Sequence, residues 1–251
     1  MKLASTSSSP TPSLRVVLGS TLYALNMVVS IVLFGPIVLC LKATTFERRY
    51  TIAQLWIRWN YWVLHKVCGL TYRVEGLENI PAQPGVVICK HQSAWETIAL
   101  QLIFPPLVSV LKKSLLRIPF WGWALSTLKP IAIDRGAKTA AMKQIIKQGT
   151  ERIREGLWVV VFPEGTRVPP GQKGRYMPGG GMLAHKARCP VVPVAHNAGE
   201  FWKRNAYLKY PGIIQVRIGP PIDGAAHSAS EINRLAEEWI EAQMVEISAP
   251  R

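Results

Sequence analysis

Residues Val86–Phe104 read VVICKHQSAWETIALQLIF, and this stretch decides the fold. It opens on apolar, mostly β-branched residues, which are typical of a buried strand. A short polar segment follows, and from Ser93 onward the apolar residues recur at the spacing of a helix. A strand that leads directly into a helix is the repeating unit of α/β proteins, so the stretch predicts that class.

Further apolar runs of strand length follow, and helical patterns over residues 137–155 and 230–247 accompany them. The alternation predicts an α/β fold whose mixed, largely parallel sheet is covered by helices on both faces. We assign this globular domain to residues 69–251. Its expected strands, besides Val86–Cys89, are Leu107–Leu111, Ile131–Ile133, Trp158–Phe162, Val191–Ala195 and Ile213–Ile218.

The most apolar part of the chain precedes this domain, because no charged residue occurs from Val16 to Leu41. As a helix this run would extend roughly 39 Å, which exceeds the ~30 Å hydrocarbon core of a bilayer. It is also longer than the apolar core of a signal peptide. Gly35-Pro36 predicts a break or a kink near its end.

A second helical segment, Ile52–Leu64, carries Trp and Tyr side chains suited to the headgroup level of a membrane. Two geometries remain open: the first segment spans the bilayer while the second lies in the interface, or both form a hairpin within one leaflet. Two ordinary core helices are a third interpretation. We expect membrane-anchoring helices over residues 14–68, after a disordered tail rich in Ser, Thr and Pro at residues 1–13.

The charge balance is strongly basic, with 30 Lys and Arg against 15 Asp and Glu and a net charge of +15. Such a field attracts nucleic acid, an anionic membrane leaflet or a phosphate-bearing substrate. The chain has none of the common nucleic-acid-binding motifs, so we expect the membrane and a phosphate and no nucleic acid. Arg48 and Arg49 follow the apolar run closely, which favours an inner membrane location with the globular domain on the cytoplasmic face.

The cysteines predict neither a metal site nor disulfide bonds. Cys40, Cys68, Cys89 and Cys189 lie far apart, without ligand spacing to each other or to histidines. We therefore expect no metal and interpret all four as buried, reduced thiols.

The clearest chemical cluster follows the strand Val86–Cys89. His91 there suits a general base, because the pKa of imidazole lies near working pH. Glu96 lies on the first turn of the expected helix, where its carboxylate can orient the imidazole and stabilise its charged form. Ser93 and Glu96 also have the spacing of a capping box, in which both only satisfy amides at the helix start. Both interpretations of Glu96 stay open.

Two more clusters follow apolar strands. Arg135 comes after Ile131–Ile133 and suits a phosphate, with a surface Asp134–Arg135 ion pair as the alternative. The segment 162–167 combines a carboxylate that suits a substrate hydroxyl or Arg167, a glycine, a hydroxyl and a cationic fork. These are Glu164, Gly165, Thr166 and Arg167. A fourth cluster, Pro190–Val194, we interpret as a structural strand.

These clusters, in this order, resemble the glycerolipid acyltransferase family, specifically the bacterial 1-acyl-sn-glycerol-3-phosphate acyltransferases. The resemblance covers roughly Tyr72–Pro220, and the segment Phe162–Arg167 matches the family's Phe-Pro-Glu-Gly-Thr-Arg motif in full. The first cluster matches the family's His-x4-Asp motif as His-x4-Glu, since Glu96 replaces Asp. In the second, Lys129 stands where Gly is usual and Ala132 where Phe is usual.

The resemblance implies an enzyme that moves a fatty acyl group from acyl-CoA or acyl-carrier protein to the sn-2 hydroxyl of lysophosphatidic acid. The product would be phosphatidic acid for phospholipid synthesis, made without a cofactor or a covalent enzyme intermediate. His91 would be the general base and Glu96 its orienting carboxylate. The acceptor would be bound by Arg135, Glu164, Gly165, Thr166 and Arg167.

Other functions are consistent with parts of the pattern. A member of the same family acting on a lyso-ornithine lipid or another lysophospholipid would carry the same motifs. A hydrolase using Ser93 as nucleophile is a weaker reading, because no G-x-S-x-G motif is present. A basic membrane adaptor without catalysis would not require His91 beside a carboxylate.

Overall fold

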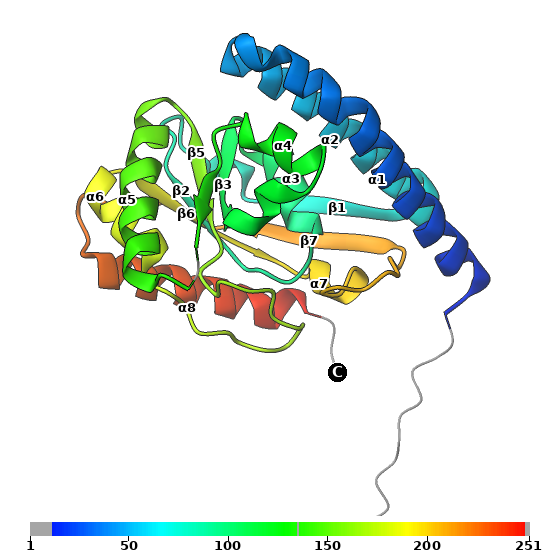
Figure 1. The fold of residues 1–251 in the computed structure, drawn as a ribbon. Helices are drawn as coiled ribbons and strands as arrows, with labels where there is room; N and C mark the ends of the chain where they lie inside the picture. Colours follow the sequence, from blue (N-terminus) through cyan, green and yellow to red (C-terminus); the bar gives the residue numbers. More distant parts are fainter. Residues whose placement is uncertain (1–11, 135, 249–251) are drawn as a thin grey trace, which may run out of the picture.

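A mixed β-sheet forms the centre of the molecule in the computed structural model, which describes residues 12–134 and 136–248 (Figure 1). The strand order is β1-β7-β6-β2-β5-β3-β4, with β8 beside β6. Neighbouring strands are parallel except β6–β7 and β6–β8, which confirms the predicted sheet. The strands are β1 Leu70–Glu75, β2 Val86–Cys89, β3 Leu107–Lys112, β4 Ile131–Ile133, β5 Trp158–Val161, β6 Pro190–His196, β7 Gly212–Ile218 and β8 Ile222–Asp223.

Helices cover both faces of this sheet, and the alternation of side chains along β2 shows why. Val86 and Ile88 pack into one core with α5 (Lys138–Arg154), α6 (Gly179–Ala187) and α8 (Ala229–Ile247). Val87 and Cys89 point to the opposite core, with α2 (Phe46–Cys68), α3 (Trp95–Ile103) and α7 (Ala198–Phe201). Because successive side chains of a strand face opposite sides, a strand buried on both faces is apolar throughout.

The N-terminal part of the chain is a helical hairpin that lies along one flank of the domain (Figure 1). It consists of α1 (Leu14–Cys40), the 3₁₀ turn η1 (Leu41–Ala43) and α2. The stretch Leu14–Ala43 is long and apolar enough to cross a membrane. Of the break or kink expected at Gly35-Pro36, the break does not occur, since α1 continues through Pro36 to Cys40. The kink stays a prediction.

A buried polar network joins the two helices of the hairpin. The Asn60 side chain is fully buried and its Oδ1 accepts a hydrogen bond from Asn26 Nδ2 at 2.8 Å. Ser30 Oγ accepts from Trp56 Nε1 at 3.0 Å and lies 3.3 Å from Asn60 Nδ2. Polar groups between apolar helices are costly unless paired, so this network fixes the register in which α1 and α2 pack.

Several elements were not among the predicted ones. These are β1, β8, the 3₁₀ turns η2 (Leu77–Asn79) and η3 (Lys113–Arg117), α4 (Trp121–Ser126) and α7. The prediction for the cysteines is correct for Cys68, Cys89 and Cys189, which are buried and free, but wrong for Cys40, which is exposed. Cys40 is exposed because it ends α1 at the tip of the hairpin, beyond the core. Residues 1–11 of the expected tail and Arg135 lie outside the described residues.

Candidate active site

The predicted site residues other than Arg135, which is not described, lie near one edge of the sheet because the strands before them are parallel neighbours. In the order β6-β2-β5-β3-β4 all adjacent pairs run the same way, so their carboxyl ends meet at one edge of the sheet. His91 follows β2 and Glu164 follows the adjacent β5. Asp134 follows β4, two strands from β5, or about 10 Å across the sheet. This edge is the usual place of sites in α/β proteins.

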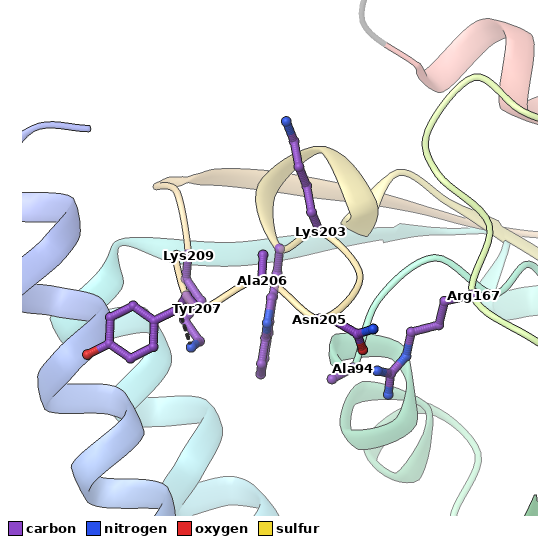
Figure 2. A pocket seen from close by; sticks show the side chains of 8 residues that line it. Ala94, Arg167, Lys203, Asn205, Ala206, Tyr207 and Lys209 are labelled. Carbon is purple, nitrogen blue, oxygen red and sulfur yellow. Dashed lines mark hydrogen bonds between the residues drawn. The ribbon is translucent and has the colours of Figure 1, made fainter. Parts of the chain in front are cut away.

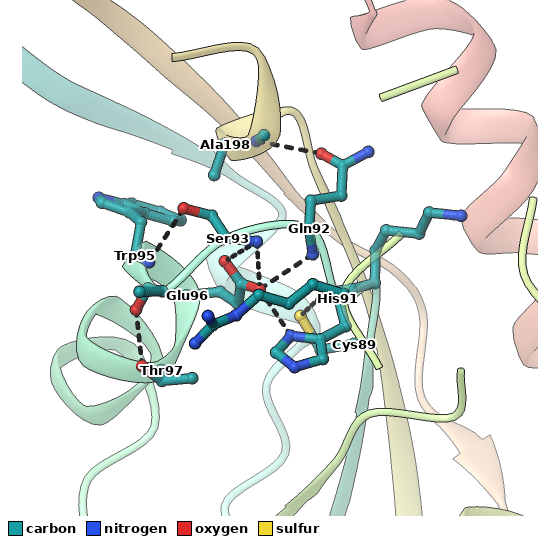
Figure 3. A network of polar contacts seen from close by, with 12 residues as sticks. Cys89, His91, Gln92, Ser93, Trp95, Glu96, Thr97 and Ala198 are labelled. Atoms are coloured by element: carbon teal, nitrogen blue, oxygen red, sulfur yellow. Dashed lines mark hydrogen bonds and ion pairs between the residues drawn. The ribbon is translucent and has the colours of Figure 1, made fainter. Parts of the chain in front are cut away.

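His91 is fixed by a short contact to Glu96. Its Nδ1 lies 2.7 Å from Glu96 Oε1, and because the carboxylate accepts, Nδ1 carries the proton (Figure 3). Nε2 is then the unprotonated nitrogen, and no hydrogen bond to it is found within residues 12–134 and 136–248. The ring stacks on Phe162 with 4.1 Å between centroids. The imidazole is therefore held on one side and able to accept a proton at Nε2.

Glu96 orients the histidine and also binds the backbone that leads into its own helix. Its Oε1 also accepts from the backbone N–H of Gln92 at 3.0 Å and of Ser93 at 2.8 Å (Figure 3). The side chain is fully buried. Burial raises the pKa of the Glu96 carboxyl, but the His196 and His91 imidazoles and the hydrogen bonds outweigh this and lower it. Glu96 thus makes both the contact to the imidazole and, with Ser93 N–H, one of the two bonds of a capping box, whereas the Ser93 hydroxyl accepts from Trp95 N–H.

A second histidine, His196, lies behind this pair at the end of β6. Its Nε2–H donates to the carbonyl of Lys90 at 2.8 Å, and its Nδ1 accepts from the backbone N–H of Ala198 at 3.2 Å. Nε2 is 3.9 Å from Glu96 Oε2. Burial lowers the pKa of His196, and the nearby Glu96 opposes this only in part. The neutral form satisfies both hydrogen bonds, so His196 supports the backbone before His91 as an uncharged group.

Glu164 is placed inside the protein. Its side chain is fully buried, with Oε1 2.8 Å from Lys90 Nζ. Its Oε2 accepts from the backbone N–H of His91 at 2.8 Å. The sequence predicted a bond to a substrate hydroxyl or to Arg167. The structure gives the carboxylate these two internal contacts, and the bond to a substrate hydroxyl stays a prediction.

Arg167 borders a cavity of about 400 Å³ next to the His91 segment (Figure 2). Ala94, at the start of α3, lines the same cavity, and the loop 202–209 forms its opposite wall. In Figure 2 the Arg167 guanidinium and the Asn205 amide point toward one another, while Lys203 points away. Arg167 Nε is buried and has no hydrogen-bond partner among the described residues. A guanidinium with an unused donor in a cavity is suited to an anion.

The other residues of this motif complete the turn. Gly165 has φ +64°, a left-handed conformation that favours glycine, and a Cβ there would meet open space. Thr166 is exposed. The backbone after Arg167 is tied to the histidine, because Val168 N–H donates to the carbonyl of His91 at 2.8 Å. The segment therefore presents Thr166 and Arg167 at the surface beside His91.

The departures from the family pattern have structural counterparts. Lys129 has φ +56°, the region that favours the glycine usual at this position, and its Nζ pairs with Glu155 at 2.7 Å.

Ser93 is fully buried and its Oγ accepts from the backbone N–H of Trp95 at 3.2 Å. A buried hydroxyl used in this way does not support Ser93 as a nucleophile.

The fold and the site define a class, α/β proteins that carry a histidine–carboxylate pair at the carboxyl edge of the sheet. Residues 71–197 match the family model described as Acyltransferase. The chain is 49% identical over 207 residues to a 1-acyl-sn-glycerol-3-phosphate acyltransferase of Pseudomonas aeruginosa, covering 81% of this chain and 80% of that protein. The chain belongs to the acyltransferase family and is an enzyme of that family.

Two more distant proteins extend the comparison. A 1-acyl-sn-glycerol-3-phosphate acyltransferase of Saccharomyces cerevisiae is 29% identical over 246 residues, which covers 92% of this chain and 78% of that protein. The crystal structure of the 1-acyl-sn-glycerophosphate acyltransferase of Thermotoga maritima superposes with a TM-score of 0.77. The alignment covers 94% of this chain and 98% of that one at 24% identity, so it shows a shared fold.

Sequence reasoning missed several residues around the site. They are the buried Lys90 and His196, Glu241 on α8, and the loop 202–209. Lys90 stood next to His91 in the sequence, and His196 stood at the end of a predicted strand, which was the available signal. Nothing local marked Glu241 or the loop, because only the tertiary fold brings them to this edge.

Proposed function

We propose that the enzyme transfers a fatty acyl group from an acyl thioester to the sn-2 hydroxyl of 1-acyl-sn-glycerol-3-phosphate, giving phosphatidic acid. The observation that carries this proposal is the His91–Glu96 pair, with Nε2 free, beside the cavity that Arg167 borders. The names of the relatives from Pseudomonas and yeast support the choice of acceptor.

In the proposed reaction His91 Nε2 takes the proton of the acceptor's free hydroxyl. Glu96 holds Nδ1–H and stabilises the imidazolium that forms. The alkoxide oxygen attacks the thioester carbonyl, and the tetrahedral intermediate collapses with loss of the thiolate. The imidazolium returns its proton to the thiolate sulfur, so the histidine ends in its starting form. No covalent bond to the protein is needed.

The acceptor's phosphate is proposed to bind at Arg167, beside Gly165 and Thr166. Arg135, which lies outside the described residues, stays a predicted ligand of the phosphate. Arg204 Nη1 donates to the carbonyl of Arg167 at 2.9 Å, which ties the loop 202–209 to this arginine. A phosphomonoester suits the planar fork of a guanidinium. Acyl-CoA and acyl-carrier protein are both anionic, so the net charge of +15 favours either donor. No metal or cofactor enters the proposed reaction.

We also propose that the hairpin attaches the enzyme to one leaflet of the inner membrane, with the catalytic domain on the cytoplasmic face. Near its start α1 is fixed to the domain, since Ser20 Oγ accepts from the backbone N–H of Lys209 at 2.9 Å. At the other end of the hairpin Arg49 Nε, on α2, donates to the carbonyl of Thr127 at 3.2 Å. A hairpin fixed to the domain at both ends cannot cross the bilayer without taking polar parts of the domain with it.

The exposed side of α1 fits this orientation. Exposed apolar residues recur every three or four positions along the whole helix and form one stripe. Such a stripe suits a helix that lies parallel to the membrane plane. On the same flank α4 contacts α1, and Phe120 and Trp123 around it are exposed as well. The stripe on α1 comprises Leu14, Leu18, Leu22, Leu25, Val29, Leu33 and Ile37.

The test is a transfer assay with the purified enzyme on vesicles, using both donors and a panel of acceptors. The panel contains 1-acyl-sn-glycerol-3-phosphate, a lysophospholipid with a larger headgroup and a lyso-ornithine lipid. We expect the first acceptor to be preferred, and His91→Ala to lower kcat by about 10²–10⁴-fold with vesicle binding unchanged. His185→Ala, on the exposed end of α6, is the control. Equal use of an acceptor without phosphate would contradict the proposal that Arg167 binds the acceptor's phosphate.

A further inference from the structure

A buried ammonium group lies directly before the proposed base. Lys90 is 1% exposed, and its Nζ is 2.8 Å from Glu164 Oε1 and 2.8 Å from Glu241 Oε1. It also donates to the carbonyl of Gln172 at 3.2 Å. Two donors of the ammonium group thus have hydrogen-bond partners, and its charge also pairs with Glu164, whose Oε1 accepts no hydrogen bond from the described residues. Ion pairing of this kind is the condition for keeping a charge inside a protein.

This ion cluster is connected to His91 through Glu164. The second oxygen of that carboxylate accepts the backbone N–H of His91 at 2.8 Å. At the other end Glu241 Oε1 accepts from the Tyr176 hydroxyl at 2.8 Å and belongs to α8. A continuous chain of contacts therefore runs from α8 through Lys90 and Glu164 to the backbone of the histidine.

We infer that Glu164 is a positioning residue for His91, held in place by Lys90 and Glu241, and that it does not bind the acceptor. The inference rests on the proposed role of His91 as general base. A carboxylate with one oxygen on the ammonium and the other on the backbone N–H has no exposed oxygen left for a substrate hydroxyl. The distance from Nε2 to the substrate hydroxyl then depends on this cluster.

The cluster places one ammonium group between two carboxylates, so the direction of the effect of removing Lys90 can be predicted. Without Lys90, two carboxylates face each other in a buried space, and their repulsion displaces Glu164 from the His91 amide. A displacement of about 1 Å at a catalytic group lowers kcat on the order of 10- to 100-fold. Binding of the acceptor depends on the Arg167 side of the site, so its KM should stay nearly constant.

The experiment compares Glu241→Gln with Glu237→Gln, the same substitution one helical turn away on α8. Glu237 also pairs with a lysine, Lys173 at 2.7 Å, but Lys173 is exposed, Glu237 is only half-buried, and the pair has no contact that leads to His91 among the described residues. We expect Glu241→Gln to lower kcat at nearly constant acceptor KM, and Glu237→Gln to behave as wild type. Lys90→Met should lower kcat further, and adding Glu164→Gln should restore part of it, because an amide oxygen still accepts the His91 N–H.

A second measurement separates this inference from the proposed function. The ring signals of His91, recorded by NMR in detergent micelles, should shift in Glu241→Gln and stay in place in Glu237→Gln. This result does not depend on whether the protein transfers an acyl group in the assay. Absence of transfer by the wild type would overturn the proposed function alone. A raised acceptor KM at unchanged kcat in Glu164→Gln, or unmoved His91 signals in Glu241→Gln, would show that Glu164 does not position the histidine.

Discussion

Glu96 shows how one buried carboxylate serves both the fold and the site. It accepts hydrogen bonds from the His91 ring and from two backbone N–H groups of the segment that leads into α3. Glu96→Gln keeps the shape of the side chain but loses the negative charge that stabilises an imidazolium. We expect kcat to fall by on the order of 10²-fold or more while the fold is retained. Steady-state kinetics together with circular dichroism check this.

Glu96→Asp is the matched control, because it keeps the charge and shortens the side chain by one methylene. The family usually has Asp here, so this variant should retain more activity than Glu96→Gln. If both variants lost activity equally, the length of the side chain and not its charge would be the property that matters.

His196 makes the stability of the protein depend on pH. Its pKa is lowered by burial from an ordinary 6.5, so the unfolded chain takes up a proton at a higher pH than the folded one. The stability it confers is complete above pH 6.5 and is lost as the pH falls toward the folded-state pKa. The slope is at most about 1.4 kcal/mol per pH unit.

Denaturant titrations at steps of about half a pH unit, between roughly pH 7.5 and pH 5, test whether the unfolding free energy depends on the protonation of His196 in this way. We expect the unfolding free energy of His196→Gln to decrease less than that of the wild type as the pH is lowered. His185→Gln, at an exposed position, should show the same decrease as the wild type. Glu96 acts in a separate window, since its pKa is lowered from 4.5 and its contribution is lost only below that pH. Equal slopes for wild type and His196→Gln would contradict the assignment.

At this scale the sequence predicted the His91–Glu96 pair because both residues lie on one strand–helix unit, where spacing fixes geometry. It also predicted that Arg167 would lie near them, since parallel strands end at a common edge. It did not predict the partners of Glu164. Lys90 is adjacent to His91, but Glu241 is far away along the chain, and only the packing of α8 brings its carboxylate to the ammonium.

Among the elements, the hairpin depends on close contact between α1 and α2. A Cβ added to Gly19 would lie 2.8 Å from the carbonyl oxygen of Val67, so glycine is what allows the two backbones to approach. We expect Gly19→Val to destabilise the protein by roughly 1–3 kcal/mol, because backbone atoms must move apart. Thermal unfolding in detergent measures this.

Thr21→Val is the control for that substitution. Thr21 lies on the exposed side of the same helical turn, so a β-branched residue there meets no packed neighbour. An unfolding temperature of Gly19→Val equal to that of Thr21→Val would show that the hairpin is not closely packed at this point.

The elements that the sequence predicted are those with a strong apolar pattern. Short buried runs such as Val86–Cys89 and Trp158–Val161 were found because both faces of these strands are covered. β1 was missed because LTYRVE mixes apolar and charged residues at the edge of the sheet. The prediction of a break at Pro36 was wrong. The missing N–H of Pro36 costs α1 one hydrogen bond, but the packing of α1 on α2 retains the helix.

For the whole molecule, the net charge of +15 predicts how the enzyme meets a membrane. Each basic residue near an anionic surface contributes about 1 kcal/mol, and this attraction is screened by salt. We expect binding to vesicles containing anionic lipid to weaken as salt is raised, and a smaller salt-independent part to remain from the apolar stripe of α1. Vesicle co-sedimentation with anionic and with purely zwitterionic lipid separates the two parts.

The orientation of the hairpin decides between the two membrane geometries that the sequence left open. If α1 crosses the bilayer, Ser13 before it and Lys42 after it lie on opposite sides. If α1 lies in one leaflet, as the contacts of the hairpin with the domain at both of its ends favour, both residues lie on the cytoplasmic side. Ser13→Cys and Lys42→Cys, each combined with Cys40→Ser, place a single exposed thiol at either end, because Cys68, Cys89 and Cys189 are buried. A maleimide that does not cross membranes should label neither variant in intact spheroplasts and both after permeabilisation. Labelling of one end alone in intact spheroplasts would establish that α1 spans the membrane. The catalytic domain would then be anchored by a transmembrane helix and would not lie against the leaflet that holds its acceptor.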